Sequence, residues 1–142
     1  MQITKYVLPV VVGAMCGMIL IILGRNLVFT IYPLLPGTDK YDADSLGRSI
    51  KLLPDKGFIM LLVNSAVCSF LAGIIATLVS KRETMRPPLV VGFVLMLAAV
   101  YDFINLGEPT WFAVINVLIY MPLAYLGYVT LRKKIVVNDQ NV

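Results

Sequence analysis

Four long apolar runs dominate this sequence, and they restrict it to a membrane fold. Of its 142 residues, 59% are hydrophobic and only 14% are charged. A soluble domain carries about 25% charged residues and under about 50% apolar ones. The runs cover approximately residues 6–32, 57–80, 89–106 and 111–131. Because about 20 apolar residues cross a bilayer as a helix, we predict an all-α membrane protein, a four-transmembrane-helix bundle that forms one integral membrane domain over residues 1–142.

The polar connection between the first two runs contains a short helical pattern of its own. Apolar and charged side chains there fall on opposite sides of a helix. The apolar side is formed by Leu46, Ile50 and Leu53, and the charged side by Arg48 and Lys51. We predict a short outer interfacial helix over about residues 45–53, with Asp44 as its N-cap and Pro54 at its end. This helix either covers the mouth of the bundle or acts as a lid over a site beneath it.

Basic residues are distributed unevenly around the four runs. Lysine and arginine dominate the side that carries both termini, whereas acidic residues balance the basic ones on the other side. Because cytoplasmic loops are enriched in lysine and arginine, we predict a multi-pass protein of the bacterial inner (cytoplasmic) membrane with both termini cytoplasmic. The basic residues of the terminal side are Lys5, Lys81, Arg82, Arg86, Arg132, Lys133 and Lys134.

Small residues recur at helical spacing in the first two runs. Such stripes let two helix backbones approach each other closely in a membrane. The predicted helix-packing residues are Gly13, Gly17 and Gly24 in the first run and Ser65, Ser69 and Gly73 in the second. We expect these faces to pack against another copy of the chain or against a larger membrane complex.

Arg25 interrupts the first apolar run and requires a partner. A guanidinium stays charged, and it costs about 3 kcal/mol at the centre of a spanning helix. The other runs place polar side chains toward the same, outer side of the membrane. Together they form a predicted ligand-binding or structural polar cluster of Arg25, Asn26, Asn64, Asp102, Asn105 and Asn116. Opposite charge and similar depth predict that Arg25 and Asp102 are in contact.

This cluster allows three interpretations. The Arg25 side chain could extend outward to the interface without any partner. The ion pair and its surrounding amides could fix which helices are neighbours, as polar contacts do in membranes. Alternatively, the cluster could bind a small anionic or lipid-like ligand that enters from the outer leaflet.

The composition offers little for catalysis, metals or nucleic acids. Histidine is absent, which removes the commonest general base and metal ligand. Cys16 and Cys68 lie in apolar runs without a CxxC motif. Ser65 has no histidine or lysine base near it in sequence, and Glu108 falls in a turn where we expect it to face water. The basic residues are too few and scattered for a nucleic-acid surface. We therefore expect no catalytic residue, metal, cofactor or nucleic-acid partner.

The order of turns and helices resembles that of small bacterial four-helix membrane proteins with no assigned activity. The segments that carry this resemblance are Tyr32-Pro33, Pro36-Gly37, Leu53-Pro54, Lys81-Arg82, Gly92 and Pro109-Thr110-Trp111. The resemblance implies the four-helix fold and no particular chemistry. Small multidrug transporters also have four helices, but they depend on an acidic residue in the middle of the first helix, where this chain has Arg25.

These observations favour a non-enzymatic small integral membrane protein. We expect an interaction, accessory or structural component of a membrane assembly, in contact with membrane lipid and with either further copies of itself or a larger membrane complex. The alternative is a transporter or binder of a small anionic or lipid-like ligand at the outer polar cluster.

Overall fold

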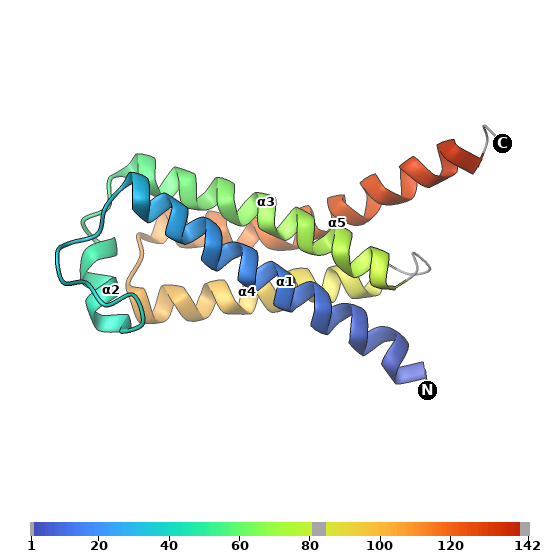
Figure 1. Ribbon diagram of the computed structural model, residues 1–142, viewed down its shortest axis with the longest axis horizontal. Coiled ribbons are helices and arrows are strands. Elements are labelled where there is room, and N and C mark those ends of the chain that lie inside the picture. Colours follow the sequence, from blue (N-terminus) through green and yellow to red (C-terminus); the bar gives the residue numbers. More distant parts are fainter. Residues whose placement is uncertain (1, 81–84, 140–142) are drawn as a thin grey trace.

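The structure, a computed structural model, describes residues 2–80 and 85–139 and consists there of helices and their connections. Four helices are long and apolar enough to cross a membrane, which confirms the predicted all-α bundle of a multi-pass membrane protein (Figure 1). The fifth helix, α2, is short and lies across one end of the bundle. The helices are α1 (Gln2–Ile31), α2 (Ala43–Ile50), α3 (Asp55–Val79), α4 (Arg86–Leu106) and α5 (Thr110–Asp139).

The spanning helices are longer than the apolar runs that predicted them. Helix α1 begins at Gln2 and α5 continues to Asp139, beyond the expected ends at residues 6 and 131. Helix α4 begins at Arg86, so that Pro87 and Pro88 occupy its first turn. Proline fits there because the first amide groups of a helix have no partner within that helix.

Helices α1 and α5 lie on opposite sides of the central pair α3 and α4. Each packs against both α3 and α4, and within the described residues α1 and α5 do not contact each other. At the end that carries the chain termini, the first part of α1 and the last part of α5 diverge (Figure 1). We call this the terminal end. The opposite end, where α2 lies over the last turns of α1 and α4 and the first turns of α3 and α5, is the capped end.

Helix α2 forms where the amphipathic pattern predicts it, but its boundaries differ. Its N-cap is Asp42, whose carboxylate accepts a hydrogen bond from the Ser45 backbone nitrogen at 3.0 Å. Asp44, the expected N-cap, instead lies in the first turn. Pro54 does not end this helix but forms the N-cap of α3. Asp42 lies two residues earlier, and its extended backbone, with φ of −98° and ψ of 116°, lets its carboxylate cap the helix.

The predicted apolar side of α2 is buried in a core at the capped end. Leu46, Ile50 and Leu53 are 7%, 1% and 9% exposed. Aromatic side chains form the centre of this core, with ring centroids of Phe58 and Phe112 5.1 Å apart. The core consists of Val28, Phe29, Leu46, Ile50, Leu53, Phe58, Leu61, Leu62, Leu106 and Phe112. Helix α2 therefore covers the mouth of the bundle through hydrophobic burial.

The helix α1 glycines pack inside the chain. A Cβ atom added to Gly13 would lie 2.9 Å from Ala76 Cβ on α3 and 2.9 Å from a Val91 methyl group on α4. One added to Gly17 would lie 3.0 Å from Ala72 Cβ. These glycines therefore let α1 settle into the groove between α3 and α4.

The small residues of α3 make a second close contact, with α5. A Cβ atom on Gly73 would overlap the Ala124 backbone, and one on Gly127 would overlap the Phe70 carbonyl oxygen. Ser69 Oγ also donates a hydrogen bond of 2.7 Å to the Tyr120 carbonyl oxygen. The packing residues predicted from sequence are thus used between helices of one chain, and they are not free to bind a partner.

Candidate functional site

Arg25 and Asp102 form the predicted ion pair between α1 and α4. Arg25 Nη2 donates to Asp102 Oδ2 at 2.6 Å, and the two side chains are 25% and 33% exposed. Arg25 lies six residues before the end of α1, which places it roughly 9 Å below that end. Asp102 lies four residues before the end of α4, roughly 6 Å below it. The pair therefore closes the seam between α1 and α4 near the capped end.

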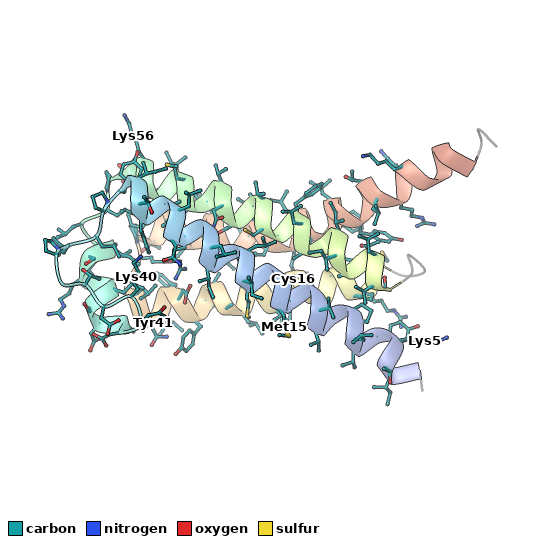
Figure 2. All side chains as sticks on the ribbon, in the orientation of Figure 1. Lys5, Met15, Cys16, Lys40, Tyr41 and Lys56 are labelled. Atoms are coloured by element: carbon teal, nitrogen blue, oxygen red, sulfur yellow. The ribbon has the colours of Figure 1, made fainter. Side chains whose placement is uncertain are left out.

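Lys40 adds a second cation near this pair. Its ammonium group donates to Asn26 Oδ1 at 3.2 Å, and Asn26 directly follows Arg25 on α1. Figure 2 shows Lys40 beside the capped end of α1. Both side chains are exposed, so Asn26 does not face the ion pair but links α1 to the connection before α2. Lys40 was not predicted, because nothing in its loop sequence indicates that it folds back onto α1.

Asn64 serves helix packing and does not join the ion pair. Its Nδ2 atom donates to the Ile21 carbonyl oxygen at 3.2 Å, and its Oδ1 atom accepts from Cys68 Sγ at 3.4 Å. The absence of a side chain at Gly24 makes room for this amide, because a Cβ atom there would overlap Asn64 Oδ1. Asn64 therefore fastens α3 to the backbone of α1.

Asn105 also lies outside the pair. Its Nδ2 atom donates back to the Tyr101 carbonyl oxygen at 2.7 Å on the exposed surface of α4. Sequence depth placed Asn105 and Asp102 together, but only Asp102 points across the seam to α1.

Asn116 is buried with an unmet hydrogen-bonding oxygen. Its side chain is 6% exposed, and its Oδ1 atom has no hydrogen-bond partner among the described residues. One helical turn further along α5, Tyr120 is 3% exposed and donates from its hydroxyl group to Ser65 Oγ at 3.2 Å. Asn116, Tyr120 and Ser65 thus form a polar group between α3 and α5, and Tyr120 was not identified from the sequence.

Glu108 is buried, and the expectation that it faces water is wrong. It is 6% exposed, and within the part of the chain that the structure describes its Oε2 atom has no hydrogen-bond partner. The reason is local geometry: α4 ends at Gly107, whose φ of 63° turns the chain inward beneath α2. Burial raises the pKa of Glu108 to about 7, although Arg25 lowers it and Asp102 raises it further.

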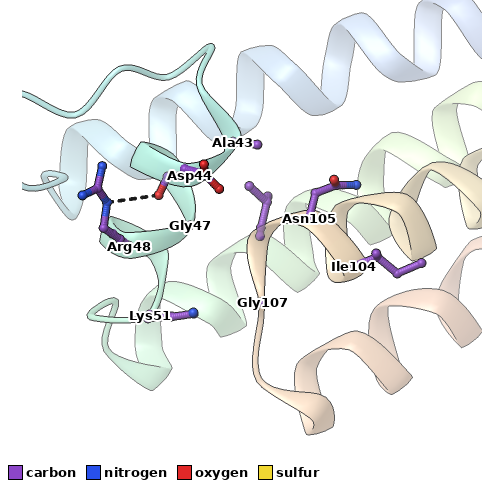
Figure 3. Close-up of a pocket in the computed structure, with 9 residues that line it drawn as sticks. Ala43, Asp44, Gly47, Arg48, Lys51, Ile104, Asn105 and Gly107 are labelled. Carbon is purple, nitrogen blue, oxygen red and sulfur yellow. Dashed lines mark hydrogen bonds between the residues drawn. The ribbon is translucent and has the colours of Figure 1, made fainter.

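A cavity of about 500 Å³ lies next to this turn, between α2 and the end of α4. Asp44, Arg48 and Lys51 line it from α2 and the residue after it, and Asn105 and Gly107 line it from α4. Figure 3 shows Lys51 directed toward Gly107 and Arg48 directed away, with Arg48 Nε bonded to the Asp44 carbonyl oxygen at 3.3 Å. The cavity is open to solvent, and Gly107, which lines it, directly precedes Glu108 in the chain.

The predicted cluster therefore separates into distinct parts. Of these residues only Arg25 and Asp102 form an ion pair. Glu108 lies close enough for both charges to influence the pKa of its carboxyl group. Among the described residues, no group of three or more His, Cys, Asp or Glu side chains could hold a metal ion. The arrangement offers partly exposed cations at a helix seam and two buried oxygen acceptors. Comparisons with protein-family models, curated proteins and solved structures find no significant match to this chain.

Proposed function

We propose that this chain is a non-enzymatic membrane protein that binds the phosphate group of an anionic lipid at the seam between α1 and α4. We further propose that the capped end faces the outside of a bacterial inner membrane and that both termini are cytoplasmic. The observation that carries the binding proposal is the partly exposed Arg25, which uses one of its nitrogens on Asp102 and keeps others free.

The guanidinium geometry supports this proposal. Arg25 Nη2 makes the single hydrogen bond to Asp102, and within the described residues no second acceptor bonds to this side chain. A guanidinium carries several N–H donors in a planar fork that fits the oxygens of a phosphate. A quarter of the side chain is accessible, so a phosphate can approach it without displacing Asp102.

The local charge supports an anionic ligand. Arg25 and Asp102 neutralise each other, and Lys40, held by Asn26, adds one positive charge beside them. A single excess positive charge next to a free guanidinium edge attracts an anion and repels a cation.

The depth of the seam supports a lipid as the source of that phosphate. Roughly 9 Å below the end of a spanning helix, Arg25 lies where headgroups meet acyl chains, not in bulk water. Ile22, one helical turn from Arg25 on α1, is 59% exposed and suits an acyl chain.

An accessory role in a larger assembly stays a prediction. The glycine and serine faces that motivated it are covered inside the chain. A partner would therefore have to bind the outer apolar surfaces, which lipid covers equally well.

Lipid binding to protein in nanodiscs tests the proposal, with phosphatidylglycerol compared with phosphatidylcholine by native mass spectrometry. We expect the R25Q/D102N/K40Q variant to lose about tenfold in phosphatidylglycerol preference, about 1.4 kcal/mol. The double substitution at the pair avoids leaving Asp102 unpaired. The control is K56Q, because Lys56 is also exposed at the capped end but points away from the bundle (Figure 2).

Soluble glycerol phosphate separates the two sources of the phosphate. If it competes fully with the lipid, the ligand is a free phosphate ester and the acyl chains add nothing. Unchanged phosphatidylglycerol preference in the triple variant would contradict the proposal.

A further inference from the structure

Glu108 occupies an unusual environment for a carboxyl group. It lies in the turn between two residues of the capped core, Leu106 and Phe112, and is itself 6% exposed. Its Oε2 atom has no hydrogen-bond partner. A charged carboxylate is costly in such surroundings, whereas the protonated acid is tolerated.

Helix α2 packs directly on the residues that precede Glu108. The Cα atom of Gly47 faces the end of α4 so closely that a Cβ atom would lie 3.0 Å from the Leu106 carbonyl oxygen. A Cβ atom on Gly107 would lie 2.9 Å from Lys51 Cε. Helix α2 and the residue after it therefore pack on the two residues that directly precede Glu108 in the chain.

The solvent-open cavity reaches Gly107, the residue directly before Glu108 in the chain. It is bordered by α2 on one side and by Leu106 and Gly107 on the other (Figure 3). If α2 moved outward, this cavity would widen beside the turn that carries Glu108.

The charged groups around Glu108 do not neutralise it in the closed arrangement. Arg25 faces it from α1 but is already paired with Asp102 from α4. Lys51, after α2, lies against Gly107. At the start of α3, Asp55 and Lys56 are exposed, and no ion pair joins either residue to Glu108 within the described chain.

We propose that Glu108 is a proton-operated latch for the cap: the protonated acid lets α2 close on the end of α4, and release of the proton to water lifts α2. The latch does not depend on the lipid site proposed above. It controls access from the capped end to the buried Asn116 and Glu108 oxygens.

The sign of the pH effect follows from the two states. In the closed state burial raises the pKa of Glu108 from 4.5 to about 7, whereas in an open, hydrated state the pKa returns toward 4.5. The closed state therefore holds the proton more tightly, and closure is favoured in acid. This preference weakens as the pH rises from 4.5 to about 7 and is lost above that value.

Cysteine labelling in liposomes measures the movement of α2. Leu46 lies on the buried face of α2 and is 7% exposed, whereas Tyr41, before α2, is 100% exposed. We expect labelling of L46C by a membrane-impermeant maleimide, divided by that of Y41C, to rise about threefold or more between about pH 5.5 and about pH 8.5. The Y41C protein corrects for the pH dependence of the thiol itself. Labelling is read site by site by mass spectrometry, so that Cys16 and Cys68 do not interfere.

The matched control is E108Q in the L46C and Y41C backgrounds. Glutamine has nearly the shape of the protonated acid, so the ratio should stay low and constant with pH. A flat ratio in the protein with Glu108, or an equal rise with E108Q, would overturn the latch.

The carboxyl resonance of Glu108 gives a second readout that needs no cysteine. The chain contains two glutamates, Glu83 and Glu108, so ¹³C-glutamate labelling yields two carboxyl signals, and E108Q assigns them. We expect the Glu108 signal to titrate near pH 7. A midpoint near the ordinary value of 4.5 would also overturn the latch, whatever the lipid-binding result.

Discussion

The capped half and the terminal half of this bundle are held together by different means. Toward the terminal end, Gly13, Gly73 and Gly127 let backbones touch. The hydroxyl group of Thr77 is satisfied there by the Gly73 carbonyl oxygen at 2.7 Å. Toward the capped end, the contacts come from aromatic rings, an ion pair and an amphipathic helix.

This difference indicates which half of the protein can respond to its surroundings. Backbone-to-backbone packing offers no titratable group and no unused hydrogen-bonding capacity. Among the described residues, the capped half has a buried titratable group, Glu108. It also has unused hydrogen-bonding capacity in the other nitrogens of Arg25 and in the Glu108 Oε2 and Asn116 Oδ1 atoms. The lipid binding and the pH response that we propose therefore both belong to the capped half.

The largest effect is expected where the α3 and α5 backbones touch. Replacing Gly73 with leucine would force the two helices apart, because even a Cβ atom overlaps the Ala124 backbone. We expect a loss of about 3 kcal/mol or more, which would prevent assembly. Thermal unfolding in detergent measures it, with V67L on the exposed face of the same helix as control. Equal stability of the two variants would show that the close contact does not hold this half together.

An intermediate effect is expected from Glu108, the one buried carboxyl among the described side chains. Its pKa is raised to about 7, so the folded state binds the proton more tightly than the unfolded state does. The free energy of unfolding should therefore fall by about 3 kcal/mol as the pH rises from about 4.5 to about 7. The E108Q variant should lack this dependence. A pH dependence that survives in E108Q would place the titrating group elsewhere in the molecule.

A smaller effect is expected at the ion pair, where both partners are partly exposed. Replacing Arg25 with glutamine leaves Asp102 without its cation and should cost about 2 kcal/mol. The R25Q/D102N protein should recover most of that loss, because neither charge is then unpaired. Unfolding of both single variants, the double variant and the parent forms the cycle. Additive losses would mean that the pair does not stabilise the seam.

The sequence predicts the architecture well because apolar length and helical spacing are local properties. The four spans and α2 all lie within a few residues of their predicted positions, with larger extensions at the polar N- and C-terminal ends. The ion pair was also predictable, since a buried cation requires an anion at similar depth, and Asp102 was the one intramembrane acid.

Glu108 and Lys40 could not be placed from sequence because their surroundings come from distant segments. Glu108 follows a glycine and precedes a proline, a context typical of an exposed turn. Its turn packs beside a segment that is distant in sequence, since Lys51, directly after α2, lies against Gly107. Asn26 and Asn105 share the depth of the pair, but their directions around their helices turn them outward.

The pairing of Arg25 with Asp102 has a consequence for biogenesis. The two residues are separated by 77 positions in the chain. At a translation rate of about 5–20 residues per second, Arg25 leaves the ribosome about 4–15 seconds before Asp102 does. During that interval α1 carries an uncompensated cation and is stable only while that cation remains near the phosphate layer. Insertion of α4 supplies Asp102, and its pairing with Arg25 then fixes the depth of α1 in the membrane.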